Sequence, residues 1–159
     1  FECIATLCGP AERVTVVAIS PDAAQVLTAY VGGTARLWST DSGECLMTLE
    51  GHHRGVIGAS FGPGGGRVLT VSEDSVRLWH TGTGVCFLVI QGHRLGIASA
   101  SFSSDVSRVL TASLDTMAKV WNAETGACLG TFSGHRGALT CAAFSEDGAQ
   151  VLTGSTDAA

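Results

Sequence analysis

The sequence predicts an all-β fold built from tandem repeats, and the spacing of its landmarks is the first reason. The dipeptide Gly-His recurs at intervals of 41 and 42 residues, at Gly51-His52, Gly92-His93 and Gly134-His135. Tryptophan recurs at the same intervals, at Trp38, Trp79 and Trp121. A fixed interval of this size indicates a repeat architecture. No segment keeps the 3.6-residue apolar periodicity of a helix, so the repeating unit is made of strands.

Two strands are predicted in the first half of each repeat. The first strand alternates in polarity and ends at an apolar residue, at Val14–Ile19, Val56–Phe61, Ile97–Phe102 and Leu139–Phe144. A turn rich in Pro, Gly and Asp follows. The second strand reads Val-Leu-Thr in every repeat, beginning at Val26, Val68, Val109 and Val151. Such a continuous apolar, β-branched run suits a strand that is covered on both faces.

Two further strands complete each repeat. The third ends at the tryptophan, a turn follows at Gly43, Gly84 or Gly126, and the fourth carries Cys45, Cys86 or Cys128. Residues 1–8 match residues 43–50 and therefore predict the last strand of a preceding repeat. We predict a single segment, 1–159, divided into residues 1–8, 9–50, 51–91, 92–133 and an incomplete repeat, 134–159.

Composition excludes several classes of protein. The formal charge is −5, so the chain lacks the basic footprint that binding of nucleic-acid phosphates requires. No apolar run approaches the length of about 18 residues that indicates a membrane-spanning helix. The six cysteines include four at one repeated position, which predicts reduced, half-buried side chains and no disulfides. We therefore expect no nucleic acid and no membrane as partners, and a location in the cytoplasm or the nucleus.

The repeated residues resemble the WD-repeat family of β-propellers. The resemblance lies in Gly-His, a Ser-x-Asp turn such as Ser113-Leu114-Asp115, and a Trp followed by a polar residue, and it extends over the whole chain. It implies four-stranded blades packed radially around a channel. The chain supplies about three and a half blades, whereas propellers close with roughly four to eight. We expect part of a larger propeller, with pairing of two copies as the alternative.

The resemblance also implies a structural hydrogen-bond network in each blade. In the family it joins the Gly-His histidine, a second-strand Thr, the turn Asp and the Trp. The corresponding residues are His52, Thr70, Asp74 and Trp79; His93, Thr111, Asp115 and Trp121; and His135, Thr153 and Asp157. The first repeat keeps only Thr28 and Trp38, and the turn of the second repeat is one residue short.

A loop rim for binding partners follows from the same resemblance. Residues after each Gly-His and before each turn Asp commonly receive partner peptides in the family. Here they are His53, Arg54, Glu73, Arg94, Leu114 and Arg136. Two interpretations of the arginines stay open: solvated charges that bind nothing, or a site for acidic or phosphorylated groups.

No motif for catalysis, a metal or a cofactor occurs in the chain. The nucleophile elbow, the His-Glu-x-x-His helix and the phosphate loop are all absent. The sequence therefore predicts a non-catalytic protein-interaction scaffold that displays peptide-binding rims. The alternative is an assembly segment whose exposed blade faces pair with another chain, or a fragment of a larger multidomain WD-repeat protein.

Overall fold

The computed structural model describes residues 6–157 of the chain. Within this range the chain forms three four-stranded antiparallel sheets and one two-stranded sheet, and no helix. The structure therefore holds no helix with the length and apolar character needed to cross a membrane, as far as it is described. The predicted all-β class is confirmed.

Each four-stranded sheet is a simple up-and-down meander. The first contains β1 (Val14–Ile19), β2 (Gln25–Tyr30), β3 (Ala35–Ser39) and β4 (Cys45–Leu49). The second contains β5 (Val56–Phe61), β6 (Arg67–Ser72), β7 (Val76–His80) and β8 (Cys86–Ile90). The third contains β9 (Ile97–Phe102), β10 (Arg108–Ser113), β11 (Ala118–Asn122) and β12 (Cys128–Phe132). The last pair is β13 (Leu139–Phe144) with β14 (Val151–Ser155).

The predicted strand order is confirmed in every sheet. The four predicted first strands coincide with β1, β5, β9 and β13, and the fourth strands begin at the repeated cysteines. The strand predicted for residues 1–8 lies mostly outside the described residues, and residues 6–8 belong to no strand. The repeat boundaries drawn from the sequence stay a prediction.

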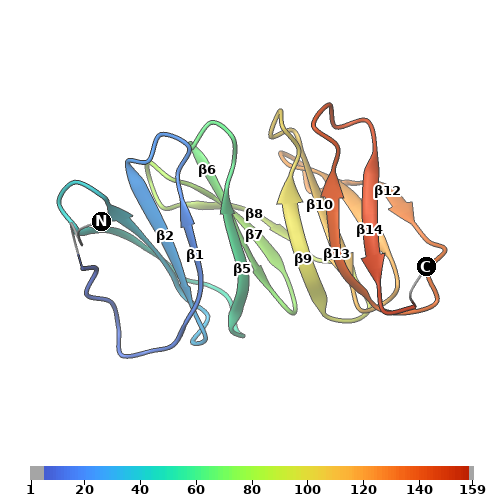
Figure 1. Ribbon diagram of the computed structural model, residues 1–159, viewed down its shortest axis with the longest axis horizontal. Helices are drawn as coiled ribbons and strands as arrows, with labels where there is room; N and C mark the ends of the chain where they lie inside the picture. The colour runs from blue at the N-terminus through green and yellow to red at the C-terminus, as the bar shows by residue number, and fades with distance from the viewer. Residues whose placement is uncertain (1–5, 158–159) are drawn as a thin grey trace.

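The sheets stand in a row, each with one face against the next, and the first and last sheets lie at opposite ends of the row (Figure 1). The leucine of each Val-Leu-Thr strand shows why. Leu27, Leu69 and Leu110 are 0% exposed, because the following sheet covers each of them. Leu152, the equivalent residue of β14, is 76% exposed. Burial in this fold therefore depends on a neighbouring sheet, as in other repeat proteins.

The row of sheets does not close on itself. At its first end, Val17 and Ile19 of β1 are 61% and 63% exposed, whereas Val16 and Ala18 on the other face pack into the core. At its last end the exposed apolar residue is Leu152. The two ends thus present apolar sheet faces of the kind that the interior sheets bury.

The cysteine prediction needs a correction. The five described cysteines are free thiols, but Cys45 and Cys128 are exposed, and only Cys86 is half-buried. These residues begin the outermost strands, where the neighbouring sheets give little cover. Cys3 lies outside the described residues.

Stability should depend on the covered leucine and not on its exposed equivalent. We expect Leu110→Ala to lower the free energy of unfolding by about 2–5 kcal/mol, because it leaves a cavity between two sheets. Leu152→Ala should change it by less than about 0.5 kcal/mol, as for other exposed positions. Urea denaturation measures both values. Equal effects of the two substitutions would contradict this account of the packing.

Candidate functional site

The third repeat joins four side chains in one hydrogen-bond network. The ring nitrogens of His93 lie 3.0 Å from Asp115 Oδ2 and 2.7 Å from Thr111 Oγ1. The indole N–H of Trp121 donates to the same Thr111 oxygen at 2.8 Å. The side chains of His93 and Asp115 are only 2% and 6% exposed, so the network is a buried one. The structure thus brings together all four residues that the sequence assigned to it.

Chemistry assigns the donors in this network. An ionised Asp115 can only accept, so the Nδ1–H of His93 donates to it. Nε2 is then an acceptor for the Thr111 hydroxyl, whose oxygen accepts from Trp121. Burial lowers the pKa of His93, against the opposing effect of Asp115. Burial alone would raise the pKa of Asp115, but hydrogen bonds from the Arg94 N–H and His93 outweigh it and lower that pKa. The result is a neutral imidazole beside a carboxylate.

The second repeat departs from the predicted network, and the assignment of Asp74 is wrong. His52 contacts Thr70 Oγ1 at 2.7 Å, and Trp79 donates to Thr70 at 2.8 Å, as in the third repeat. The other ring nitrogen of His52, however, lies 3.2 Å from the hydroxyl of Ser75. Because the turn is one residue shorter, the residue after Asp74 reaches the imidazole. Asp74 is left exposed at the surface.

Without a carboxylate in contact, His52 is a weaker base. Burial is the main cause that lowers its pKa to about 4, and the charge of Arg77 adds to this effect. Asp74 acts in the opposite direction, but it does not touch the ring. The imidazole of His52 is therefore neutral at neutral pH.

In the first repeat a tyrosine occupies the place of the missing histidine. Thr28 donates to Tyr30 Oη at 3.0 Å and accepts the indole N–H of Trp38 at 2.8 Å. Tyr30 stands where the other repeats have Ser72, Ser113 and Ser155. A Cβ at Gly9 would lie 2.5 Å from the Tyr30 hydroxyl, so a glycine fits there. Sequence analysis missed Tyr30, although its departure from the repeated serine is visible in the sequence.

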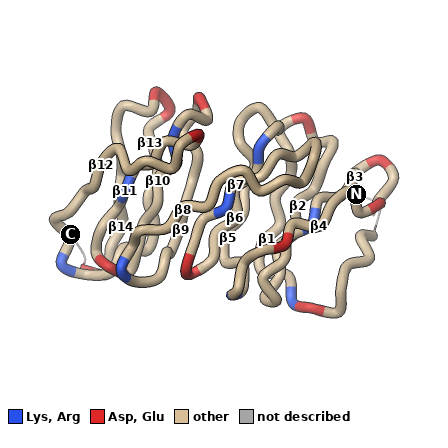
Figure 2. The backbone as a smooth tube through the Cα atoms, turned by 180° about the vertical axis from the view of Figure 1, so that it is seen from behind, with Lys and Arg blue, Asp and Glu red and all other residues tan. Residues whose placement is uncertain are grey.

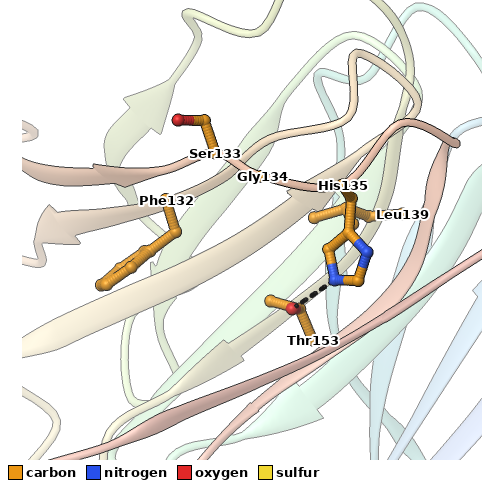
Figure 3. Close-up of a pocket in the computed structure, with 6 residues that line it drawn as sticks. All are labelled: Phe132, Ser133, Gly134, His135, Leu139 and Thr153. Atoms are coloured by element: carbon orange, nitrogen blue, oxygen red, sulfur yellow. Dashed lines mark hydrogen bonds between the residues drawn. The ribbon is translucent and has the colours of Figure 1, made fainter. Parts of the chain in front are cut away.

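The fourth repeat keeps the polar half of the network. His135 contacts Asp157 at 3.0 Å and Thr153 at 3.0 Å. A cavity of about 290 Å³ adjoins them, lined by Phe132, Ser133, Gly134, His135, Leu139 and Thr153 (Figure 3). A Cβ at Gly92 would lie 2.9 Å from the Trp121 ring, whereas a Cβ at Gly134 would have no neighbouring atom within 4 Å. The cavity therefore lies where the third repeat holds its tryptophan.

The rim residues lie on the loops beside these networks. Arg54 and Glu73 form an ion pair at 2.9 Å, with both side chains more than half exposed. They line a cavity of about 420 Å³ between the second and third sheets, together with Asp74, Arg94 and nearby residues. His53, Leu114 and Arg136 are exposed, and none of them lines this cavity.

The charges of the rim do not form one basic surface. Figure 2 shows Lys and Arg as separate segments along the row of sheets, several with Asp or Glu close by. The Arg54–Glu73 pair is an example. No ion pair joins Arg94 or Arg136 to a carboxylate in the described part of the chain. These two side chains are therefore the rim cations open to a ligand.

Residues 6–157 contain no group of three His, Cys, Asp or Glu side chains that could hold a metal ion. The three Gly-His histidines, His52, His93 and His135, contact Thr, Ser or Asp side chains of their own repeat. Their geometry fixes loops to strands.

Comparison with known families agrees with the geometry. The model of the WD domain, G-beta repeat, matches residues 1–39, 43–80, 84–122 and 126–158. The chain belongs to the WD40 family. Its three sheets are WD40 blades, and β13 and β14 are the first two strands of a fourth. Members of this family are generally non-catalytic and mediate protein interactions.

Two relatives share parts of these WD40 repeats. Human WD repeat-containing protein 86 is 53% identical over 34 residues, which is 21% of this chain and 9% of that protein. Pre-mRNA-processing factor 19 of Bos taurus is 32% identical over 71 residues, 45% of this chain and 14% of that protein. The matched stretches thus span a small part of both relatives.

The low pKa of His52 predicts a loss of stability in mild acid. The unfolded chain takes up a proton on His52 near pH 6.5, whereas the folded chain does so only near pH 4. This contribution is present above pH 6.5 and is lost as the pH falls toward 4. When the pH is lowered from 7 to about 4.5, the wild type should lose part of its free energy of unfolding through His52. The loss in His52→Gln should be smaller than in the wild type by roughly 2 kcal/mol.

Denaturant titrations at both pH values measure this difference. An unchanged pH dependence in His52→Gln would show that His52 is not the group that titrates.

Removal of the Tyr30 hydroxyl tests its place in the first network. Tyr30→Phe should lower the free energy of unfolding by about 1 kcal/mol, because Thr28 loses a buried hydrogen-bond partner. In a Thr28→Val background the same change should cost less, since the partner is already gone. A double-mutant cycle measures this coupling, and a coupling of zero would refute the interaction.

Proposed function

We propose that this chain is a non-catalytic scaffold whose loop rim binds segments of partner proteins. WD40 repeats and WD-repeat relatives support an interaction scaffold in general. The observation that favours the rim is a direct link, in the third and fourth repeats, between the hydrogen-bond network and the loop that follows its histidine. Asp115 accepts the backbone N–H of Arg94 at 2.9 Å, and Asp157 accepts that of Arg136 at 2.6 Å.

These backbone contacts give the rim a fixed shape before any partner arrives. The carboxylate that holds the histidine also holds the arginine that follows it, so core and loop form one unit. A rigid loop loses less conformational entropy on binding than a flexible one. Rigid display on a stable scaffold is a common basis for loop-mediated recognition.

We further propose acidic or phosphorylated groups as ligands of the rim. Arg94 and Arg136 have no carboxylate partner among the described residues, and a guanidinium pairs well with carboxylate or phosphate oxygens. Arg54 contributes less to ligand binding, because its guanidinium already forms an ion pair with Glu73. His53 and Leu114, which are exposed on the same loops, are proposed to contribute contact area.

Neutralising the two open arginines tests this ligand class. Arg94→Gln and Arg136→Gln should each weaken binding of phosphoserine peptides about tenfold, since each removes a charge-assisted hydrogen bond. Arg67→Gln is the control, because Arg67 lies away from the rim and pairs with Glu124. Fluorescence anisotropy with matched phosphorylated and unphosphorylated peptides gives the affinities. Equal affinity of the double variant and the wild type would refute this ligand class.

An assembly role is the alternative, and the exposed sheet faces favour it. Val17, Ile19 and Leu152 are apolar, yet they face away from their neighbours. A second copy, or further repeats of a larger multidomain WD-repeat protein, would bury them. Light scattering distinguishes the first case: a dimer that dissociates on Leu152→Arg supports pairing of copies, and a monomeric wild type excludes it.

We also propose that the protein is located in a reducing compartment. The five described cysteines are unpaired, which supports the cytoplasm or the nucleus.

A further inference from the structure

The second repeat differs from the third in the position of its turn carboxylate. In the third repeat Asp115 is buried, contacts His93 at 3.0 Å and accepts two backbone N–H groups, from Arg94 and Met117. In the second repeat Ser75 takes over the contact with the histidine. Asp74 is therefore released from a structural role that the same position performs one blade away.

Asp74 lines the cavity of about 420 Å³ between the second and third sheets. Its side chain has one long contact, 3.5 Å from the Ser75 hydroxyl. The neighbouring carboxylate, Glu73, is neutralised by Arg54 at 2.9 Å. Among the carboxylates that line the cavity, Asp74 is thus the one that forms no ion pair with a described residue. The cavity presents an unpaired carboxylate from the second sheet and the unpaired guanidinium of Arg94 from the third.

We propose that this cavity binds a Lys or Arg side chain of a partner peptide through Asp74, next to an acidic residue that meets Arg94. The charges on the two walls are complementary to such a pair. The inference rests on the proposed function, because it assigns the residue pattern that the peptide-binding rim selects. It adds a requirement for a basic residue, which the arginines alone would not impose.

Other occupants fit the cavity less well. A metal ion would need several carboxylates or imidazoles, and the described residues include no such group of three. A phosphate group alone would meet the unpaired carboxylate of Asp74 as a like charge, which disfavours binding. A basic side chain next to an acidic one relieves that repulsion and also leaves Arg94 paired.

The contribution of Asp74 should be mainly to specificity. Exposed ion pairs add little to affinity because water and salt screen them. Once a bound peptide covers the carboxylate, a charged hydrogen bond contributes more, and an unpaired charge opposite the wrong residue is costly. The same ligand is therefore expected to bind less tightly when its basic residue is replaced by Ala or Glu.

A peptide array with the full chain tests this inference. The probes are short synthetic peptides in which two adjacent positions carry every pairing of Lys, Arg, Ala, Glu and phosphoserine. We expect the wild type to bind peptides with a basic–acidic pair about tenfold more tightly than those with Ala in place of the basic residue. Asp74→Asn should remove this preference, and Asp74→Lys should shift it toward Glu at that position.

The control is Asp41→Asn, which removes the same charge from an exposed turn between β3 and β4. It should retain the preference, and thermal melting should show that all variants fold. Binding that is unaffected by Asp74→Asn, or a wild type indifferent to the basic residue, overturns the inference alone. If no peptide of the array binds the wild type, the proposed rim function fails with it.

Discussion

The buried threonine hydroxyl is the contact on which the rest of each blade depends. In all three complete sheets it lies 2.8 Å from an indole N–H, at Thr28, Thr70 and Thr111. The hydroxyl of the same threonine bonds a second side chain, so it satisfies two buried polar groups at once. Since an unpaired buried polar group is costly, this arrangement fixes the third strand against the second, and in the second and third repeats it also fixes both against the preceding loop.

The second partner of the threonine is what varies between repeats. It is Tyr30 in the first, His52 in the second and His93 in the third. All three partners contact the same threonine hydroxyl, although they come from different places in the repeat: Tyr30 belongs to the second strand, and the histidines belong to the loop before the first strand. Geometry and hydrogen-bonding capacity, and not one residue type, are therefore what the site requires.

The sequence predicted the strands and the third network well, for physical reasons that are local. Strand alternation, turn residues and the Val-Leu-Thr segments all act within a few positions, so Val56–Phe61 and Ile97–Phe102 could be placed without a structure. The roles of Ser75 and Tyr30 could not be predicted in the same way. They depend on how far a turn carries a side chain and on the space that Gly9 leaves, which the repeat pattern does not encode.

Substitution within the networks also changes which charges the loops display. A carboxylate that bonds the histidine is buried and is not displayed at the surface, as with Asp115, whose side chain is 6% exposed. Once Ser75 performs that task, the carboxylate one residue earlier faces the cavity between two blades. Repeats with equivalent backbones therefore display different charges on the same rim. All blades of such a scaffold must pack in the same way. Replacing the residue that bonds the buried histidine is therefore one way to change the charges on the rim without changing the fold.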